Sequence, residues 1–233
     1  MEIHAIQLSF ITEHALFDQL LVYVPPNKRA KINKFHQFED KLRSLIADLL
    51  SRVVMCRLMY ITNRNFTSKL NVTSYGKPYL EGSSLHYNLS HSGVWVVLVV
   101  DHEPVGIDIE KKQTIDLDIA SGFFSPAEYA DLSSLPCSQR TNYFYSLWTL
   151  KEALIKADGR GLSIQFDTFS FSLRNDRIYF DPACSDLPQY YFHQYDIAPD
   201  YSLSVCAMND KFPENIHIWD FETLISNVKN FLR

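Results

Sequence analysis

Two long segments repeat apolar residues at three- and four-residue steps, the period of an amphipathic α-helix. The first begins at Leu42 and continues to about Leu58, and the second covers residues 138–158. Gly159 and Gly161 follow the second segment and predict its C-terminal stop and exit turn. One predicted helix therefore lies on each side of the Asp101–Pro104 turn, which we take as the boundary between residues 1–103 and 104–233.

Alternation of apolar and polar residues predicts β-strands between and around these helices. The apolar run 94–100 and the alternating run 105–110 are joined by four residues, which predicts a β-hairpin. A second antiparallel sheet is expected in the last third of the chain. The remaining predicted elements are strands at 3–8, 85–92, 168–174, 177–181, 189–196 and 202–208, and helices over 12–22 and 221–231.

The composition is that of an ordinary soluble protein, with 46% apolar and 21% charged residues. A net charge of −5 argues against nucleic-acid binding. The N-terminus lacks a basic, apolar signal pattern, and the run 94–100 is too short for a membrane span, so we expect a cytoplasmic protein without a membrane partner. Widely spaced cysteines without a C-x-x-C pair predict free thiols and no thiolate metal site: Cys56, Cys137, Cys184 and Cys206.

The segment VGIDIE places two carboxylates on one face of a strand. Val105, Ile107 and Ile109 fall on one face, and Asp108 and Glu110 on the other. Neighbouring carboxylates repel each other unless a positive charge lies between them. Two interpretations remain open here: a solvated acidic face on an edge strand, or oxygen ligands for Mg²⁺ or Mn²⁺.

The second predicted helix carries Glu152 and Lys156 four residues apart, so their side chains are neighbours. Such a pair is commonly an exposed ion pair worth a few tenths of a kcal/mol. Trp148 lies one turn earlier on the same side, which favours a partly buried site. Before this helix, Ser125, Pro126 and Glu128 form a capping-box pattern, and this structural role is sufficient to explain Glu128.

Positive charge is concentrated near the N-terminus in an otherwise acidic chain. Residues 28–43 hold six basic and two acidic residues, which suits either a solvated helix face or an anion site. The turn Ser90-His91-Ser92-Gly93 suits close approach to an oxyanion, although a structural histidine is the alternative. Zinc binding by His86 and His91 is disfavoured because no further ligand follows at metal-site spacing.

These features converge on phosphoryl-type transfer, which needs a metal ion and fixed positive charge around phosphate oxygens. Asp108, Glu110 and Glu152 could share one Mg²⁺. The groups that could surround a polyphosphate are Lys28, Arg43, His91 and Lys156.

The chain also resembles a known family. YGKPYL, YNLSHSG, VGIDIE, FFSPAEY and WTLKEALIKADGRGLSI are similar, in this order, to the motifs of surfactin-type (Sfp-type) 4′-phosphopantetheinyl transferases. The resemblance implies an α+β fold of two similar halves about a pseudo-twofold axis, each a long helix on a small antiparallel sheet, with coenzyme A and Mg²⁺ between them. It implies Asp108, Glu110 and Glu152 as metal ligands. It implies these coenzyme A contacts: Lys28, Lys31, Arg43, Lys77, Ser90, His91 and Lys156.

The resemblance further implies a reaction. Phosphopantetheine would move from coenzyme A to a serine of an acyl- or peptidyl-carrier protein, releasing adenosine 3′,5′-bisphosphate. Asp108, Glu152 and Lys156 are the expected catalytic residues: Glu152 accepts the serine proton or acts as a ligand alone, and Lys156 stabilises the departing phosphate.

We expect a monomer whose carrier protein docks on residues 113–124, where Phe123 and Phe124 are adjacent and at least one belongs to the core. Two alternatives remain: another Mg²⁺-dependent phosphohydrolase, and a non-catalytic module that binds coenzyme A or a carrier protein.

Overall fold

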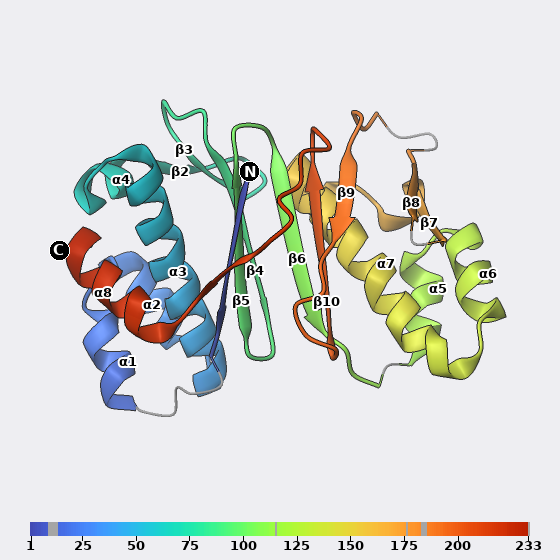
Figure 1. The fold of residues 1–233 in the computed structure, drawn as a ribbon, viewed down its shortest axis with the longest axis horizontal. Helices are drawn as coiled ribbons and strands as arrows, with labels where there is room; N and C mark the ends of the chain where they lie inside the picture. Colours follow the sequence, from blue (N-terminus) through green and yellow to red (C-terminus); the bar gives the residue numbers. More distant parts are fainter. Residues whose placement is uncertain (9–13, 115, 176, 183–185, 233) are drawn as a thin grey trace.

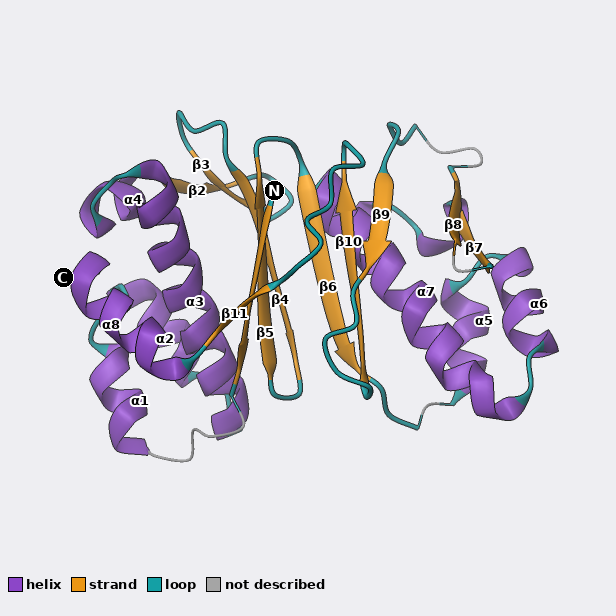
Figure 2. Ribbon diagram, in the orientation of Figure 1, coloured by secondary structure: helices purple, strands orange, loops and turns teal. Residues whose placement is uncertain are grey.

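The computed structural model describes residues 1–8, 14–114, 116–175, 177–182 and 186–232. They form two halves of similar construction, each with a 22-residue helix packed against a small β-sheet (Figure 1). The two sheets lie at the centre of the molecule, and most helices lie on the two outer sides (Figure 2). This arrangement confirms the predicted α+β architecture.

The first half is built around helix α3 (Phe38–Met59). Its sheet has the order β11-β1-β5-β4, and α3 buries the predicted apolar stripe against it. The strands of this sheet are β1 (Glu2–Gln7), β4 (His86–Ser92), β5 (Trp95–Asp101) and β11 (His217–Trp219). The other elements are α1 (His14–Leu21), α2 (Pro26–Asn33), α4 (Asn63–Lys69), α8 (Phe221–Phe231) and the hairpin β2 (Leu70–Val72) and β3 (Pro78–Leu80).

The second half is built around helix α7 (Cys137–Asp158), which ends at Gly159 in the left-handed conformation, as predicted. Its antiparallel sheet has the order β6-β10-β9. The elements of this half are β6 (Val105–Lys111), β7 (Ser170–Arg174), β8 (Arg177–Asp181), β9 (Tyr191–Gln194), β10 (Tyr201–Ala207), α5 (Ala120–Phe123) and α6 (Pro126–Ser134). Three short 3₁₀ turns lie at Leu117–Ile119, Gly161–Ser163 and Phe166–Thr168.

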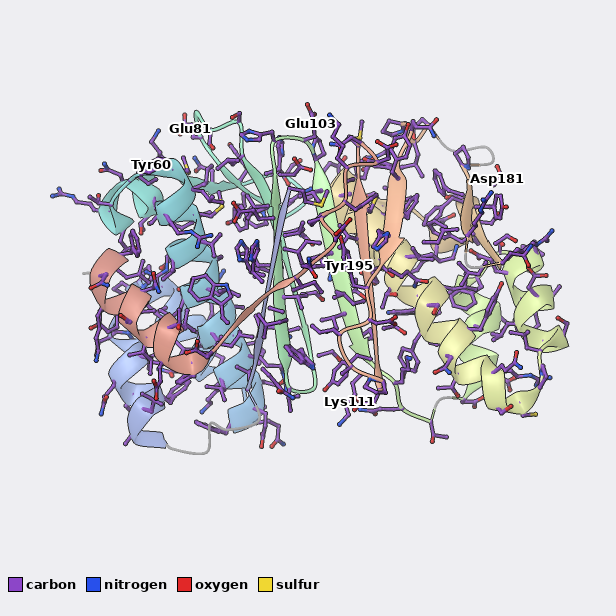
Figure 3. All side chains as sticks on the ribbon, viewed as in Figure 1. Tyr60, Glu81, Glu103, Lys111, Asp181 and Tyr195 are labelled. Atoms are coloured by element: carbon purple, nitrogen blue, oxygen red, sulfur yellow. The ribbon has the colours of Figure 1, made fainter. Side chains whose placement is uncertain are left out.

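The two sheets contact each other through an apolar layer. Ile3, Ala5 and Val97 from the first sheet share a buried cluster with Ile107 and Val205 from the second. Side chains fill this space, with Tyr195 at its border (Figure 3). Because each sheet also has a helix on its other face, the central strands are apolar on both sides. The predicted apolar face of residues 105–109 is confirmed by this layer.

The predicted hairpin between residues 94–100 and 105–110 is wrong. β5 pairs with β1 on one edge and with β4 on the other, so it has no free edge for β6. β6 pairs instead with β10. The turn at residues 102–104 therefore carries the chain from one sheet to the other.

The end of the chain returns to the first half. β11 pairs in parallel with β1, and α8, found where the sequence predicted a helix, contributes Leu224 and Val228 to the core around α3. A division at residues 103/104 therefore places residues 217–232 with the wrong sheet. The predicted second sheet is also smaller than expected, since β7 and β8 pair only with each other among the described residues.

No helix in the described part of the chain is long and apolar enough to cross a membrane. Cys56 and Cys206 are buried free thiols, and Cys137 is an exposed one. Cys184 and the first two residues of the predicted 12–22 helix lie outside the described residues.

The buried histidine His4 connects β11, the strand near the C-terminus, to the first strand, β1. Trp219 Nε1 donates a hydrogen bond to His4 Nδ1 at 3.2 Å, and the His217 ring stacks on the His4 ring at 5.2 Å. Glu2 lies 3.0 Å from His4 Nε2, with Arg57 bound to the same carboxylate. Burial lowers the pKa of His4 to about 4; Glu2 opposes the shift, and Arg57 and His217 add to it.

We predict that His4 makes the protein less stable in weak acid. Because the folded pKa lies below that of an unfolded histidine, the stabilisation is complete above about pH 6.5 and is lost as pH falls towards 4. Between pH 7 and pH 5 the loss from His4 amounts to about 2 kcal/mol. Denaturant unfolding of wild type and His4→Gln at both pH values measures it, and equal pH dependence in the two proteins contradicts the prediction.

Candidate active site

A cavity of about 930 Å³ opens between the two halves. Helices α2, α3 and α4 and the β2–β3 hairpin form one wall, and β6 and α7 form the other. Most residues predicted from the sequence line it, namely Lys28, Lys31, Ser90, His91, Asp108, Glu110, Glu152 and Lys156, with Trp148 beside them. Motifs far apart in the sequence therefore meet in one place.

Strands β4 and β6 lie side by side at the floor of this cavity, although they belong to different sheets. Alternate side chains of β4 bridge the gap. Asn88 Oδ1 accepts a hydrogen bond from Ile107 N at 3.0 Å, and Ser90 Oγ donates to Asp108 Oδ1 at 2.8 Å. Ser92 Oγ donates to Glu110 Oε2 at 2.8 Å and accepts from Lys111 N at 3.0 Å. We call this set of contacts the β4–β6 seam.

Lys156 reaches into the seam from α7. Its Nζ lies 2.6 Å from Asp108 Oδ1 and 3.0 Å from Ser90 Oγ. The expected alternative of a surface ion pair with Glu152 is therefore wrong, because the carboxylate partner of Lys156 is the buried Asp108. Asp108 Oδ2 is also buried and has no hydrogen-bond partner among the described residues, so this carboxylate retains one free oxygen.

Two further carboxylates crowd the same centre. Burial raises the pKa of Glu110, and the charge of Asp108 raises it further. The pKa of Glu152 is raised by the same two causes in the same order, against the opposing effect of Lys156. Three carboxylates thus lie near the Lys156 ammonium group in a partly desolvated site, where burial and mutual repulsion disfavour ionisation of Glu110 and Glu152.

The donor set suits a hard divalent cation, because the free oxygen of Asp108 and the two carboxylates nearby are oxygen ligands. As they stand, however, no three His, Cys, Asp or Glu side chains of the described residues converge closely enough to enclose a metal ion. Ser92 holds Glu110, and Lys156 holds Asp108. The residues fit such an ion by charge and chemistry, and their present hydrogen bonds would have to open to receive it.

The close approach of α7 to β6 depends on Gly106. A Cβ atom at this position would lie 2.0 Å from Ala153 O and 2.4 Å from Ala157 N. Only glycine lets the helix backbone rest directly on the strand. This contact brings Glu152 and Lys156 beside Asp108.

The predicted basic contacts divide into two groups. Lys28 and Lys31 from α2 line the cavity. Arg43 instead donates to Gly93 O at 2.7 Å and pairs with Asp40, so it braces the turn after β4. Lys77 Nζ likewise donates to a backbone carbonyl, Ala157 O, at 2.7 Å. This geometry gives no support to Lys77 as a coenzyme A contact.

His91 lies in the cavity wall, where the charges of Arg43 and Lys156 act on it. Desolvation lowers the pKa of its ring, and Arg43 and Lys156 lower it further. The imidazole is therefore neutral at neutral pH, and it can offer one N–H donor to an anion.

The capping box at α6 is confirmed. Ser125 Oγ accepts from Glu128 N, and Glu128 Oε2 accepts from Ser125 N. Sequence analysis missed the partner of Glu128, which is the fully buried Lys151 at 2.9 Å. Lys151 also donates to the carbonyls of Phe166 and Phe169 at 2.6 and 2.8 Å. Lys151, the residue before Glu152, is thus part of the interior of the second half.

Sequence analysis also missed polar residues of α3 that line the cavity. Arg52 is buried and donates from Nε to Asp48 Oδ2 at 2.8 Å and from Nη1 to Asn63 Oδ1 at 3.0 Å. Asp48 and Arg52 both line the cavity. An Asp and an Arg four residues apart within a strongly apolar helix were the available signal.

Family models of known proteins match both parts of the chain. The family model described as "4'-phosphopantetheinyl transferase, N-terminal" matches residues 12–103, and that of the "4'-phosphopantetheinyl transferase superfamily" matches residues 104–206. The chain is 36% identical over 227 residues to the 4'-phosphopantetheinyl transferase Sfp of Bacillus subtilis (strain 168), covering 97% of this chain and 100% of that protein. The chain belongs to the 4′-phosphopantetheinyl transferase family.

Other phosphopantetheinyl transferases are similar over most of their length. One from Bacillus subtilis is 38% identical over 213 residues, covering 89% of this chain and 92% of that protein. The transferase psf-1 of Bacillus pumilus is 35% identical over 238 residues, covering 99% and 100%. The family indicated by the sequence motifs is therefore confirmed, and its two models meet in the turn that joins the two sheets.

We predict that Gly106→Ala destabilises this phosphopantetheinyl transferase by about 1–3 kcal/mol, the usual cost of overpacking. The added methyl must push α7 away from β6, so Glu152 and Lys156 move from Asp108 and transferase activity falls as well. Denaturant unfolding and an activity assay measure the two effects. Gly122→Ala is the control, because a Cβ there meets no atom of the described residues within 4 Å and stability should change by less than about 0.5 kcal/mol. Equal stability of both variants contradicts the prediction.

Proposed function

We propose that this transferase moves the phosphopantetheine arm of coenzyme A onto a serine hydroxyl of an acyl- or peptidyl-carrier protein and requires Mg²⁺. One observation carries the proposal: Lys28 and Lys31 line the same cavity as the carboxylate–lysine centre of Asp108 and Lys156. A cavity of about 930 Å³ is large enough for a nucleotide-sized ligand.

In this proposal the basic wall binds the phosphates of coenzyme A. Lys28 and Lys31 supply charge from α2, and His91 supplies an N–H donor from the end of β4. Ser90 lines the same place, and its hydroxyl would have to leave Asp108 before it could donate to a phosphate. Charge-assisted hydrogen bonds of this kind hold phosphate oxygens more tightly than neutral donors do. The pyrophosphate then lies next to Lys156, since Lys156 already donates to Ser90.

The transfer itself forms one phosphorus–oxygen bond and breaks another. The serine oxygen of the carrier attacks the phosphorus that bears the pantetheine arm, and the pyrophosphate bond breaks to release adenosine 3′,5′-bisphosphate. Glu152 accepts the serine proton, and Lys156 stabilises the negative charge of the departing phosphate. Bound Mg²⁺, held by Asp108, Glu110 and Glu152, would neutralise pyrophosphate charge.

Carrier docking is proposed at Phe123, beside the cavity. The structure confirms that one of the two adjacent phenylalanines belongs to the core, because Phe124 is 3% exposed, whereas Phe123 is 41% exposed. The Phe123 ring packs edge-on against Trp148 at 5.4 Å, and Trp148 lines the cavity. An apolar side chain resting on Phe123 would therefore bring its protein to the cavity rim. Residue 115 of the predicted docking segment lies outside the described residues.

The transfer is tested with coenzyme A, Mg²⁺ and a panel of apo carrier proteins. We expect at least one carrier to gain the mass of one phosphopantetheine group, with adenosine 3′,5′-bisphosphate released in equal amount. Asp108→Ala should reduce this gain by at least about a hundredfold at limiting Mg²⁺, because it removes the carboxylate that holds Lys156.

Two outcomes would reject this function. Cleavage of coenzyme A without any gain on a carrier indicates a phosphohydrolase. Tight binding of coenzyme A or carrier without turnover indicates a binding module.

We predict that Phe123→Ala raises the KM for the carrier protein about tenfold, as expected for one truncated aromatic contact, and leaves the KM for coenzyme A unchanged. Steady-state kinetics with each substrate varied in turn measure both constants. Tyr79→Ala is a matched control, because Tyr79 is 43% exposed on β3 in the other half. A lower melting temperature with an unchanged KM for the carrier would assign Phe123 to packing alone.

A further inference from the structure

The loop between β2 and β3 forms part of the cavity wall. Thr73 and Lys77 close it, because Thr73 N donates to Lys77 O at 2.9 Å and Lys77 N donates to Thr73 Oγ1 at 3.1 Å. Gly76 within the loop has a φ of +88°, which favours glycine. Val72, Gly76 and Pro78 line the cavity. The loop is thus a braced turn that belongs to the first half.

The side chain of Lys77 crosses from this loop to the second half. Its Nζ donates to Ala157 O at 2.7 Å and to Val105 O at 3.4 Å. Its aliphatic part lies over Gly159, where an added Cβ would be 2.8 Å from Lys77 Cδ. Gly159, with a φ of +87°, ends helix α7. Lys77 therefore holds the end of the helix and the beginning of β6 at once.

This contact stabilises the last turn of α7. The last four carbonyls of an α-helix have no partner within the helix, and the helix dipole favours a cation there. Ala157, whose carbonyl Lys77 holds, directly follows Lys156 in the chain. The position of that turn sets where the Lys156 ammonium group lies relative to Asp108 and Ser90.

We propose that Lys77 is a positioning residue that fastens the β2–β3 loop to the end of α7 and so fixes Lys156 for transfer, without contacting coenzyme A itself. The effect of Lys77 on kcat rests on the function proposed above, whereas its contact with the end of α7 does not.

The ammonium group of Lys77 titrates near the physiological range. Burial lowers the pKa of Lys77 to about 8, and Cys206 and Asp158 act in the opposite direction. His86 also lies close to it, and the charge of Lys77 helps to lower the pKa of the His86 ring. As pH rises through about 8, Lys77 loses its charge and its bond to the Ala157 carbonyl weakens.

The experiment compares Lys77→Met, Lys77→Arg and the control Lys69→Met at the base of the same hairpin. We expect Lys77→Met to lower kcat about tenfold, as for one lost hydrogen bond from a charged group, with the KM for coenzyme A unchanged. Lys77→Arg should retain most of kcat and lose the decline of kcat above about pH 8, because arginine stays charged. Lys69→Met should behave as wild type.

Hydrogen exchange measures the fastening without any assay of activity. In Lys77→Met, amides of residues 73–77 and of the last turn of α7 should exchange faster, while the rest of α7 keeps its protection. If wild type fails to transfer phosphopantetheine, the proposed function is lost, but this measurement still decides the role of Lys77.

A different result would overturn the proposal. Lys28→Met, which removes a proposed phosphate contact, should raise the KM for coenzyme A. If Lys77→Met does the same, with normal kcat and normal exchange, Lys77 binds coenzyme A and does not position the helix. Normal exchange together with normal kinetics would leave Lys77 without either role.

Discussion

The hydrogen bonds from β4 side chains to β6 are the interaction on which the active site depends. Both strands are edges of their own sheets, and exposed edges commonly pair through their backbones. Here Asn88, Ser90 and Ser92 bridge them instead, and two of these contacts end on Asp108 and Glu110. The acidic centre is therefore held in place by hydroxyl groups of the other half. Neither half alone contains a complete site.

Polar groups buried in this molecule are placed where they hold elements together. The Glu128–Lys151 pair joins α6 to α7, and its lysine also holds the carbonyls of Phe166 and Phe169. Removing one member of such a pair is costly, because the other charge is left without a partner. On another face of α7, Gly106 allows direct contact with β6. Helix α7 is thus fixed by a buried ion pair and by a close backbone contact.

Local signals predicted much of this structure. Apolar periodicity located α3, α7 and α8, and alternation placed Asp108 and Glu110 on one face, because these properties depend on residues close in sequence. Strand partners depend on contacts between distant residues, so the hairpin expected from residues 94–110 was wrong and the return of β11 was not foreseen. The partners of the basic residues could not be predicted for the same reason. Arg43 and Lys77 bind backbone carbonyls that lie 50 and 80 residues away in sequence.

The parallel pairing of β11 with β1 places both ends of the chain in the same half. During synthesis β1, at residues 2–7, is made long before its outer neighbour, which comes from residues 217–219. The sheet therefore stays incomplete until the residues between these two strands have been made. Until then the edge of β1 and the apolar surface that α8 later covers stay open to other strands, and chaperones have their longest opportunity to bind there.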